Sequence, residues 1–434
     1  MRYALFALLA ACADQSGTLS VTLTTAPGSH VLDAASELRL VLTSPHQVQT
    51  ATRGGSGFTI SIEVPATGAT TSLIVDALDD TGAIIATGAS PPFALGGSDA
   101  EVAIYMAAPN TIGAAPAALA TARAALATGA LAYGAIFAGG LDPTGAASDA
   151  LEIYNAYDHT LIEGLTMPAA RSAQMLGVGS NGLVYLFGGA DSTGTPTDSL
   201  WSFDTTAAPS GSYSDLGDKT GFARANAATV PIASDEYLIA GMPGFDLIGT
   251  QGAVTAVAKV PALPAAGTSV EASDGTTTAL FADATGVVRY RAGAYDTPTI
   301  AAATRAGSVI ALPGGEFAVV CGGLSDGVEI DAATESTMAL PGVPGVGKTG
   351  CVTAATATGV LIAGGLLESG GVDPTATIYD PATFAPIATT TLVVPRYNAV
   401  GLPLPNGQIL IAGGVDANGA PIATLELFTP ASAE

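Results

Sequence analysis

The 434-residue sequence is poor in charge, and above all in positive charge. Lysine and arginine together number 13 against 37 acidic residues, so the formal net charge is −24. A surface of that sign repels phosphate backbones and anionic lipid head groups, and we expect neither nucleic-acid binding nor electrostatic membrane binding. With only three histidines and three cysteines, we expect no metal site and no cofactor, and no residue stands out as catalytic.

No segment after the first residues is apolar over the length that a transmembrane helix needs. The start of the chain resembles a bacterial lipoprotein signal peptide, because Arg2 precedes an apolar run that ends in Leu9-Ala10-Ala11-Cys12. The resemblance implies removal of residues 1–11 and acylation of Cys12, followed by a tether at residues 12–17. It also implies a lipid anchor in the cell envelope, and Ala13 favours the outer membrane. The alternative is an ordinary signal peptide and a secreted or periplasmic protein.

Two further cysteines, Cys321 and Cys351, would meet an oxidising compartment in an exported protein and could form a disulfide. Two separate buried thiols remain the alternative, because the spacing does not show whether their Cα atoms come within about 7 Å.

Residues 18–107 alternate between apolar and polar side chains and are interrupted by Pro-Gly, Thr-Gly and Gly-Gly turns. This pattern is typical of short antiparallel strands with one buried face and predicts a β-sandwich. We expect His30 and His46 to be solvated histidines in loops. The expected inward-facing residues are Leu19, Val21, Leu23, Leu38, Leu40, Leu42, Ile60, Ile62, Val64, Val102, Ile104 and Met106.

After an Ala/Pro/Gly-rich linker at residues 108–118, residues 119–434 repeat with a period of 40 to 52 residues. The strongest mark of each unit is an apolar strand that ends in a glycine pair. Periods of this length with several strands per unit are typical of propeller blades. The pairs end at Gly140, Gly189, Gly323, Gly365 and Gly414, with weaker copies at Tyr237–Gly241 and Ala279–Asp283.

Two other residue types recur in the same register. An aromatic residue follows the second glycine by 14 positions, at Tyr154, Phe203, Tyr379 and Phe428. A basic residue precedes the glycine pair in six of the seven units. We call these six residues the basic register: Arg123, Arg171, Arg224, Arg305, Lys348 and Arg396.

The combination of a basic residue, an apolar strand with Gly-Gly and an aromatic strand resembles the kelch repeat over about 310 residues, although the late tryptophan of that repeat is missing. The resemblance implies an all-β chain in which a sandwich precedes a kelch-like β-propeller of seven blades, or of six if the third and fourth units form one. The segment before Arg123 would supply the outer strand of the last blade and close the ring. After the glycine pairs, Asp142–Gly145, Asp191–Gly194 and Asp416–Gly419 predict one shared hairpin loop, with Asp capping its own turn.

Two sequence motifs suggest nucleotide binding, but their context argues against it. Residues 342–349 match the phosphate-binding loop, yet the β-branched stretch that follows predicts a strand where that site needs a helix. Residues 177–182 match the dinucleotide pattern but lie between two predicted strands, which favours a hairpin turn. Some kelch propellers resemble galactose oxidase. With one histidine, His159, in the repeat region, the copper ligands of such an enzyme are missing.

The basic register is the most promising functional feature, because equivalent positions in a ring lie on one circle. It would form a positive collar for carboxylates, acidic sugars or an acidic peptide. Alternatively, each cation holds the ring together by pairing with an Asp or a backbone carbonyl. The leading hypothesis is a non-enzymatic envelope lipoprotein whose propeller binds a protein or a glycan. The alternative is a carbohydrate-active enzyme with carboxylates in the propeller mouth.

Overall fold

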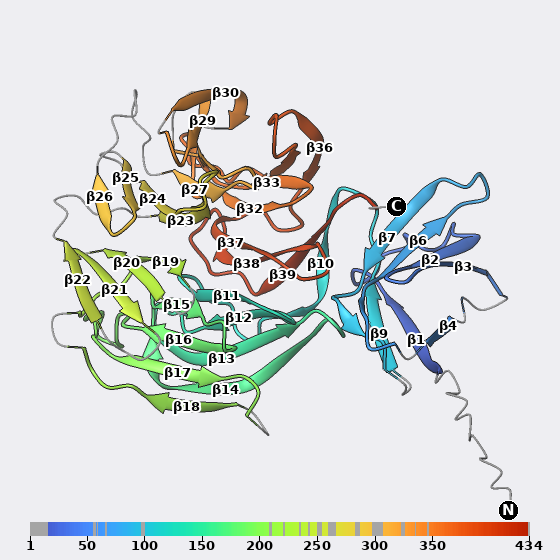
Figure 1. Ribbon diagram of the computed structural model, residues 1–434, viewed down its shortest axis with the longest axis horizontal. Helices are drawn as coiled ribbons and strands as arrows, with labels where there is room; N and C mark the ends of the chain where they lie inside the picture. Colours follow the sequence, from blue (N-terminus) through green and yellow to red (C-terminus); the bar gives the residue numbers. More distant parts are fainter. Residues whose placement is uncertain are drawn as a thin grey trace, which may run out of the picture.

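The structure is a computed structural model, and the expected all-β class is confirmed: the described part of the chain contains strands and turns but no α-helix (Figure 1). The structure describes residues 16–54, 58, 60–65, 67–96, 100–207, 211–219, 222–233, 236–241, 244–249, 254–258, 266–282, 287–296, 307–322, 326–334, 336–344 and 347–432. No helix in these ranges is long and apolar enough to cross a membrane. The lipidation candidate Cys12, Arg305 of the basic register and Gly323 lie outside the described residues.

The N-terminal unit contains two principal sheets, ordered β4-β1-β9 and β3-β2-β6-β7, and a small pair β5-β8. The alternating residues named above form one core between the two sheets, in which Leu23 is partly buried and the others are buried. The strands are β1 (Ser16–Thr24), β2 (Glu37–Thr43), β3 (His46–Thr52), β4 (Ser61–Pro65), β5 (Thr70–Thr71), β6 (Leu73–Leu78), β7 (Ile84–Ala89), β8 (Phe93–Ala94) and β9 (Ala100–Tyr105).

Three details of this unit differ from the sequence prediction. Strand β1 begins at Ser16, inside the expected tether. The first and last strands, β1 and β9, pair in parallel, although only antiparallel pairing was expected. Alternation reports which face of a strand is buried but carries no information about the direction of its neighbour. His46 opens strand β3 and does not lie in a loop.

The rest of the described chain forms seven four-stranded antiparallel sheets, numbered here in chain order. Sheet 1 holds β11 (Ala127–Leu131), β12 (Gly134–Ala138), β13 (Ser148–Asn155) and β14 (Thr160–Arg171). Sheet 2 holds β15 (Met175–Val178), β16 (Leu183–Phe187), β17 (Leu200–Asp204) and β18 (Ser212–Asp215). Sheet 3 holds β19 (Ala228–Ala233), β20 (Glu236–Gly241), β21 (Gly244–Gly249) and β22 (Val254–Ala258). Sheet 4 holds β23 (Ala266–Glu271), β24 (Thr277–Ala282), β25 (Val287–Arg291) and β26 (Ala294–Asp296).

Sheet 5 holds β27 (Ser308–Ala311), β28 (Glu316–Val320), β29 (Asp326–Asp331) and β30 (Thr337–Pro344). Sheet 6 holds β32 (Val352–Thr356), β33 (Gly359–Ala363), β35 (Thr375–Tyr379) and β36 (Pro386–Thr391), with the short pair β31 (Lys348–Thr349) and β34 (Leu366–Leu367) beside it. Sheet 7 holds β37 (Tyr397–Pro403), β38 (Ile409–Val415), β39 (Thr424–Thr429) and, from the other end of the chain, β10 (Thr111–Ala118). The third and fourth sequence units therefore form separate sheets.

The first strands of the seven sheets lie innermost and follow one another in order (Figure 1). Each contacts the first strand of the next sheet, and β37 contacts β11, so the series of neighbours closes on itself. A hydrophobic cluster lies between each sheet and the next, including sheet 7 and sheet 1. Because a sheet must bury its apolar faces, each sheet is stabilised by both of its neighbours.

Strand β10 corrects the prediction of a linker at residues 108–118. Residues 111–118 pair with β39 from Thr111↔Thr429 to Ala118↔Thr424, and Ala115 is buried. The small Ala and Pro side chains that suggested a linker fit an outer strand of a sheet. The segment before Arg123 thus completes the last sheet, as the repeat pattern predicted.

The N-terminal unit is joined to sheets 1 and 7 by a shared core and by His159. Tyr105 of β9 packs in one buried cluster with Tyr154 of sheet 1 and Leu427 of sheet 7. The backbone N–H of Tyr105 donates to Nε2 of His159 at 3.2 Å, and Nδ1 of His159 lies 2.8 Å from the hydroxyl of Tyr154. Since Nε2 accepts, Nδ1 carries the proton and the imidazole is neutral.

His159 is a buried residue, 2% exposed, and burial lowers its pKa from 6.5 to about 4, against the opposing charge of Asp158. The unfolded chain therefore takes up this proton at a higher pH than the folded chain. The stabilising contribution is complete above pH 6.5 and is lost as the pH falls toward 4.

We predict that His159→Gln makes unfolding less sensitive to acid, because glutamine has an acceptor but no proton to gain. Between pH 7 and pH 4, the free energy of unfolding should fall by up to about 3 kcal/mol more in the wild type than in the variant. Urea unfolding, followed by the fluorescence of the single tryptophan, Trp201, measures this difference. The exposed His30 provides the control His30→Gln, and parallel pH profiles of wild type and His159→Gln would contradict the assignment.

Candidate functional site

The basic register was the candidate site, and Arg123 shows how its members are held. This side chain is fully buried and donates from NH1 to the carbonyl oxygens of Gly139 and Ala150. Its NH2 group forms an ion pair with Glu152 on β13. The other carboxylate oxygen of Glu152 accepts the backbone N–H of Ala120 at 2.7 Å. Each polar group of this buried pair thus has a partner within the chain, save the unpartnered Nε of Arg123.

Arg396 repeats the arrangement in sheet 7. Its NH1 group donates to the carbonyl oxygens of Gly413 at 3.1 Å and Thr424 at 2.9 Å, and its NH2 group pairs with Glu426. Glu426 also accepts the backbone N–H groups of Val393 and Val394. Burial lowers the pKa of Arg396, while the charge of Glu426 opposes that shift. The same two causes act on the pKa of Arg123.

Arg171 ends β14 and leads into sheet 2, and among the described residues it has no carboxylate partner. The third-strand position that holds Glu152 in sheet 1 holds Trp201 in sheet 2, since Glu152 faces Phe137 and Trp201 faces the equivalent Leu186. The guanidinium of Arg171 lies 5.0 Å from the centre of the Trp201 ring, a cation–π contact in place of an ion pair. Arg171 is only partly buried, and its Nε is without a hydrogen-bond partner.

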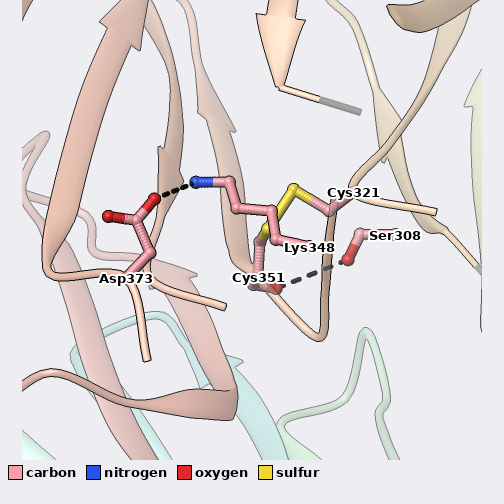
Figure 2. Close-up of a disulfide and its surroundings, with 5 residues drawn as sticks. All are labelled: Ser308, Cys321, Lys348, Cys351 and Asp373. Atoms are coloured by element: carbon pink, nitrogen blue, oxygen red, sulfur yellow. Dashed lines mark hydrogen bonds and ion pairs between the residues drawn. A yellow bond between two sulfur atoms is a disulfide. The ribbon is translucent and has the colours of Figure 1, made fainter. Parts of the chain in front are cut away.

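The remaining described members of the basic register are also turned inward. Arg224 is 2% exposed and donates to the carbonyl oxygens of Phe222 and Ile239. Lys348 is buried and its Nζ lies 2.7 Å from Asp373 (Figure 2). Although burial raises the pKa of Asp373, the hydrogen bond from Lys348 and others bring it below its usual value. Four of the five described cations are therefore buried within their sheets, which favours the structural interpretation of the register over an exposed collar.

The glycine pairs explain why the basic residues recur, because three of the pairs contact the backbone of the basic residue that precedes the next sheet. The second glycine donates its N–H to the backbone carbonyl of the next basic residue: Gly140 to Arg171, Gly189 to Arg224 and Gly365 to Arg396, at 2.9, 2.9 and 3.0 Å. A Cβ on the first glycine of each of these pairs would collide with the same carbonyl oxygen. Both glycines take positive φ angles, from 51° to 109° in these three pairs. The close approach and the positive φ angles therefore favour glycine at both positions of these three turns.

In sheet 5 the glycine pair is displaced by one residue from its predicted place. Val320 pairs with Ser308 as Ala138 pairs with Ala127, so Cys321 takes the position of the first glycine, with a φ of 57°. Gly322 takes the second position and forms a bridge to Thr349. The two turn positions of sheet 5 are therefore Cys321 and Gly322, one residue before the glycine pair that the repeat pattern predicted.

Cys321 is joined to Cys351 by a disulfide with a Cα–Cα distance of 6.0 Å (Figure 2). Of the two alternatives that the sequence left open, a disulfide or two separate thiols, the structure has the disulfide. Cys351 precedes β32, so the bond links sheet 5 to sheet 6 at the junction where other sheets use a close glycine contact. Both cysteines are buried.

The innermost strands surround a central cavity of about 390 Å³. Its wall consists of small alkyl and hydroxyl side chains such as Thr128, Ala228, Ser308, Val309 and Thr353. None of the residues that line it, all within the described part of the chain, is an Asp, Glu or His. No group of three or more potential metal ligands occurs among the described residues.

The end of the sheets that carries the glycine pairs and the loops after them is called here the glycine-turn end, and its partly exposed aspartates cap their own loops, as predicted. Oδ1 of Asp142 accepts the N–H groups of Thr144 and Ala146 as well as the Thr144 hydroxyl. These hydrogen bonds, the hydroxyl first, lower the pKa of Asp142 and keep it ionised. Asp191 and Asp416 form the same loop in sheets 2 and 7. This end of three neighbouring sheets therefore carries fixed negative charge.

Both rejected nucleotide motifs have the structure that was expected of them. A strand, β32, follows Lys348 where a phosphate-binding loop needs a helix, and residues 177–182 lie in the β15–β16 hairpin. The sequence analysis missed the carboxylates Glu152 and Glu426. The available signal was a glutamate two positions before the register aromatic in the first and last units.

Comparison with known proteins gives little guidance. No family model matches the chain, and neither does any curated protein. A solved structure titled "Structure of YjhT" resembles 60% of this chain and 96% of its own, at 15% sequence identity and a TM-score of 0.41. A similarity at this level carries no argument about site or function.

We predict that Arg396→Ala destabilises the protein far more than Arg171→Ala. Removing Arg396 leaves a buried Glu426 carboxylate without its cation, at a cost of about 3–5 kcal/mol. Removing Arg171 loses a partly exposed cation–π contact worth about 1 kcal/mol. Urea unfolding of both variants measures the difference. Equal, small losses would show that the Arg396–Glu426 pair does not stabilise the protein.

We also predict that Cys321→Ser with Cys351→Ser lowers the free energy of unfolding by about 3–4 kcal/mol, because a cross-link over 30 residues is lost. Cys321→Gly with Cys351→Ala should recover part of the loss, since glycine tolerates the left-handed backbone at position 321. Thermal unfolding without reductant tests both double variants, with Cys12→Ser as the control. A serine double variant as stable as that control would refute the role of the disulfide.

Proposed function

We propose that the seven sheets form a seven-bladed, kelch-like β-propeller and that the N-terminal unit is a β-sandwich. Support comes from the chain order of the sheets, the hydrophobic cluster between each successive pair, and the contact of β37 with β11. Radial repetition of four-stranded sheets is the defining property of a propeller. The repeated glycine turn with its buried cation supports the likeness to kelch repeats.

In this proposal the protein acts outside the cytoplasm. A lipid on Cys12 anchors it to the cell envelope, at the outer membrane. The sequence Leu9-Ala10-Ala11-Cys12 supports the anchor. The disulfide between Cys321 and Cys351 supports export independently, because such bonds persist in oxidising compartments.

Its function is to bind a protein or glycan ligand without chemical turnover, and the glycine-turn end of the propeller is the binding face. The carrying observation is the set of short, self-capped loops on sheets 1, 2 and 7, which hold ionised aspartates in fixed positions. The N-terminal unit contacts the opposite end, at the β13–β14 turn, so it leaves these loops free. Rigid loops on a stable scaffold suit recognition.

The charge at this face favours a neutral or basic ligand over the acidic one expected from the basic register. The described cations of the register are mostly buried, whereas Asp142, Asp149 and Glu368 lie at this end on loops or strand ends. With a net charge of −24, the protein attracts a basic protein segment through its long-range field. A carbohydrate-active enzyme remains the alternative.

The test is an array of basic peptides and neutral glycans probed with the Cys12→Ser chain, which cannot be acylated. We expect saturable binding without release of product. Asp149→Lys combined with Glu368→Lys should weaken it about fivefold to tenfold at low salt, since neither side chain caps a turn. Asp80→Lys, on a loop of the N-terminal unit, is the matched control.

Two outcomes would overturn the proposal. Hydrolysis of an arrayed glycan, seen as released reducing sugar, would favour the enzyme. Binding that the double charge reversal leaves unchanged, while the Asp80→Lys control weakens it, would place the ligand on the N-terminal unit.

A further inference from the structure

A cavity of about 220 Å³ lies between the N-terminal unit and the seven sheets, at the end opposite the glycine turns. One wall comes from β6 and β7 of the N-terminal unit. The other comes from the β32–β33 turn, the β37–β38 turn and the segment after β39. The lining residues are Ile74, Thr87, Gly88, Ala89, Thr356, Ala357, Thr358, Asn406, Gly407, Gln408, Thr429, Pro430 and Ala431.

The cavity is fixed in place by contacts around it. Ser432, just beyond the lining segment, donates its hydroxyl to the buried Asp76 of β6 at 3.0 Å. The backbone N–H of Ala431 donates to Asn110 at 3.2 Å. Both walls therefore belong to one packed assembly, and the cavity exists before any ligand enters.

The wall is uncharged and carries aliphatic surface beside a few polar side chains. Ile74, Ala89, Ala357 and Pro430 present alkyl surface, and none of the lining residues, all of them described, is ionisable. An ion would lose its hydration here without gaining an opposite charge, which is costly. The cavity thus selects for uncharged molecules, in contrast to the acidic loops at the other end.

Three buried polar side chains in the lining, those of Asn406, Gln408 and Thr429, keep hydrogen-bond donors in reserve. The backbone N–H of Gln408 donates to Oδ1 of Asn406, which fixes the orientation of that amide. Nδ2 of Asn406 then donates to Oε1 of Gln408, and Nε2 of Gln408 donates to the Thr429 hydroxyl. In the described part of the chain, each amide nitrogen thus uses one of its two protons, and Thr429 donates none.

We infer that this cavity is a binding site for a small, neutral, aliphatic molecule that carries a carbonyl acceptor, such as a fatty amide or ester of short chain. The carbonyl oxygen accepts from the unused amide or hydroxyl protons of Asn406, Gln408 and Thr429. The alkyl chain lies against Ile74, Ala89 and Ala357. An engineered apolar cavity of about 150 Å³ holds benzene, so a ligand of roughly eight to ten non-hydrogen atoms fits.

The test uses hexanamide as the probe and saturation-transfer NMR on the full Cys12→Ser chain as the readout. We expect binding with a Kd of about 1 mM or tighter. Hexanoate, the same size but anionic, should bind at least tenfold more weakly. Ala357→Trp should abolish the signal by filling the cavity from its exposed turn, and Ala89→Leu should weaken it from the facing wall.

Ala132→Trp is the matched control, because Ala132 occupies the corresponding first-to-second-strand turn of sheet 1, away from the cavity. Unchanged hexanamide binding in both Ala357→Trp and Ala89→Leu would overturn the inference, as would equal binding of hexanoate or no binding of hexanamide to the parent chain. These results are independent of the glycine-turn face, so they leave the proposed function untouched.

Discussion

The contact between a glycine turn and the backbone of the next basic residue is the interaction on which the arrangement of sheets depends. The carbonyl oxygen of Arg171 accepts the N–H of Gly140, and a Cβ on Gly139 would occupy the space of that oxygen. The side chain at this register position binds the glycine turn of its own sheet, as Arg123 does with Gly139. Arg396 combines both contacts, because its backbone carbonyl accepts the N–H of Gly365 of sheet 6 and its side chain donates to the carbonyl of Gly413 of sheet 7.

This double use explains how a protein with few cations distributes its charge. Burying a guanidinium is costly unless protein acceptors replace its water, and Glu152 and Glu426 together with backbone carbonyls do so for Arg123 and Arg396. Arg171 is only partly buried and keeps part of its hydration, so the cation–π contact with Trp201 in sheet 2 takes the place of an ion pair. Because cations are held inside, the solvent-facing loops are left with aspartates, and the surface is more acidic than the composition alone would suggest.

Local patterns in the sequence predicted the strands and the glycine turns, because each depends on residues close in the chain. The closing strand β10 was predicted from the repeat, whose last unit needed one more outer strand. The predictions that failed concern strands and side chains whose partners lie far away in the sequence. Alternation placed Leu19 and Val102 in the core but could not show that β1 and β9 run in parallel. The sequence does not show whether a glutamate on a strand is exposed or buried, so Glu152 was not predicted as the partner of Arg123. Cys321 stands at the first turn position of sheet 5, where the other sheets named above have glycine. Its disulfide to Cys351 makes there the link to sheet 6 that a glycine contact makes at other junctions.

The N-terminal unit is packed against sheets 1 and 7 and is connected to sheet 7 at both ends of the chain. Strand β9 ends at Tyr105 and β10 begins at Thr111, so the chain that leaves the N-terminal unit almost at once becomes part of sheet 7. That sheet pairs β10 with the last strand of the chain, and the tail beyond β39 returns to Asp76 of β6. Completion of sheet 7 and packing of the N-terminal unit are therefore coupled, and His159 lies in the same interface. The cavity between the N-terminal unit and the seven sheets is already ordered in the folded protein. A ligand that binds there therefore loses little binding free energy to ordering of the site.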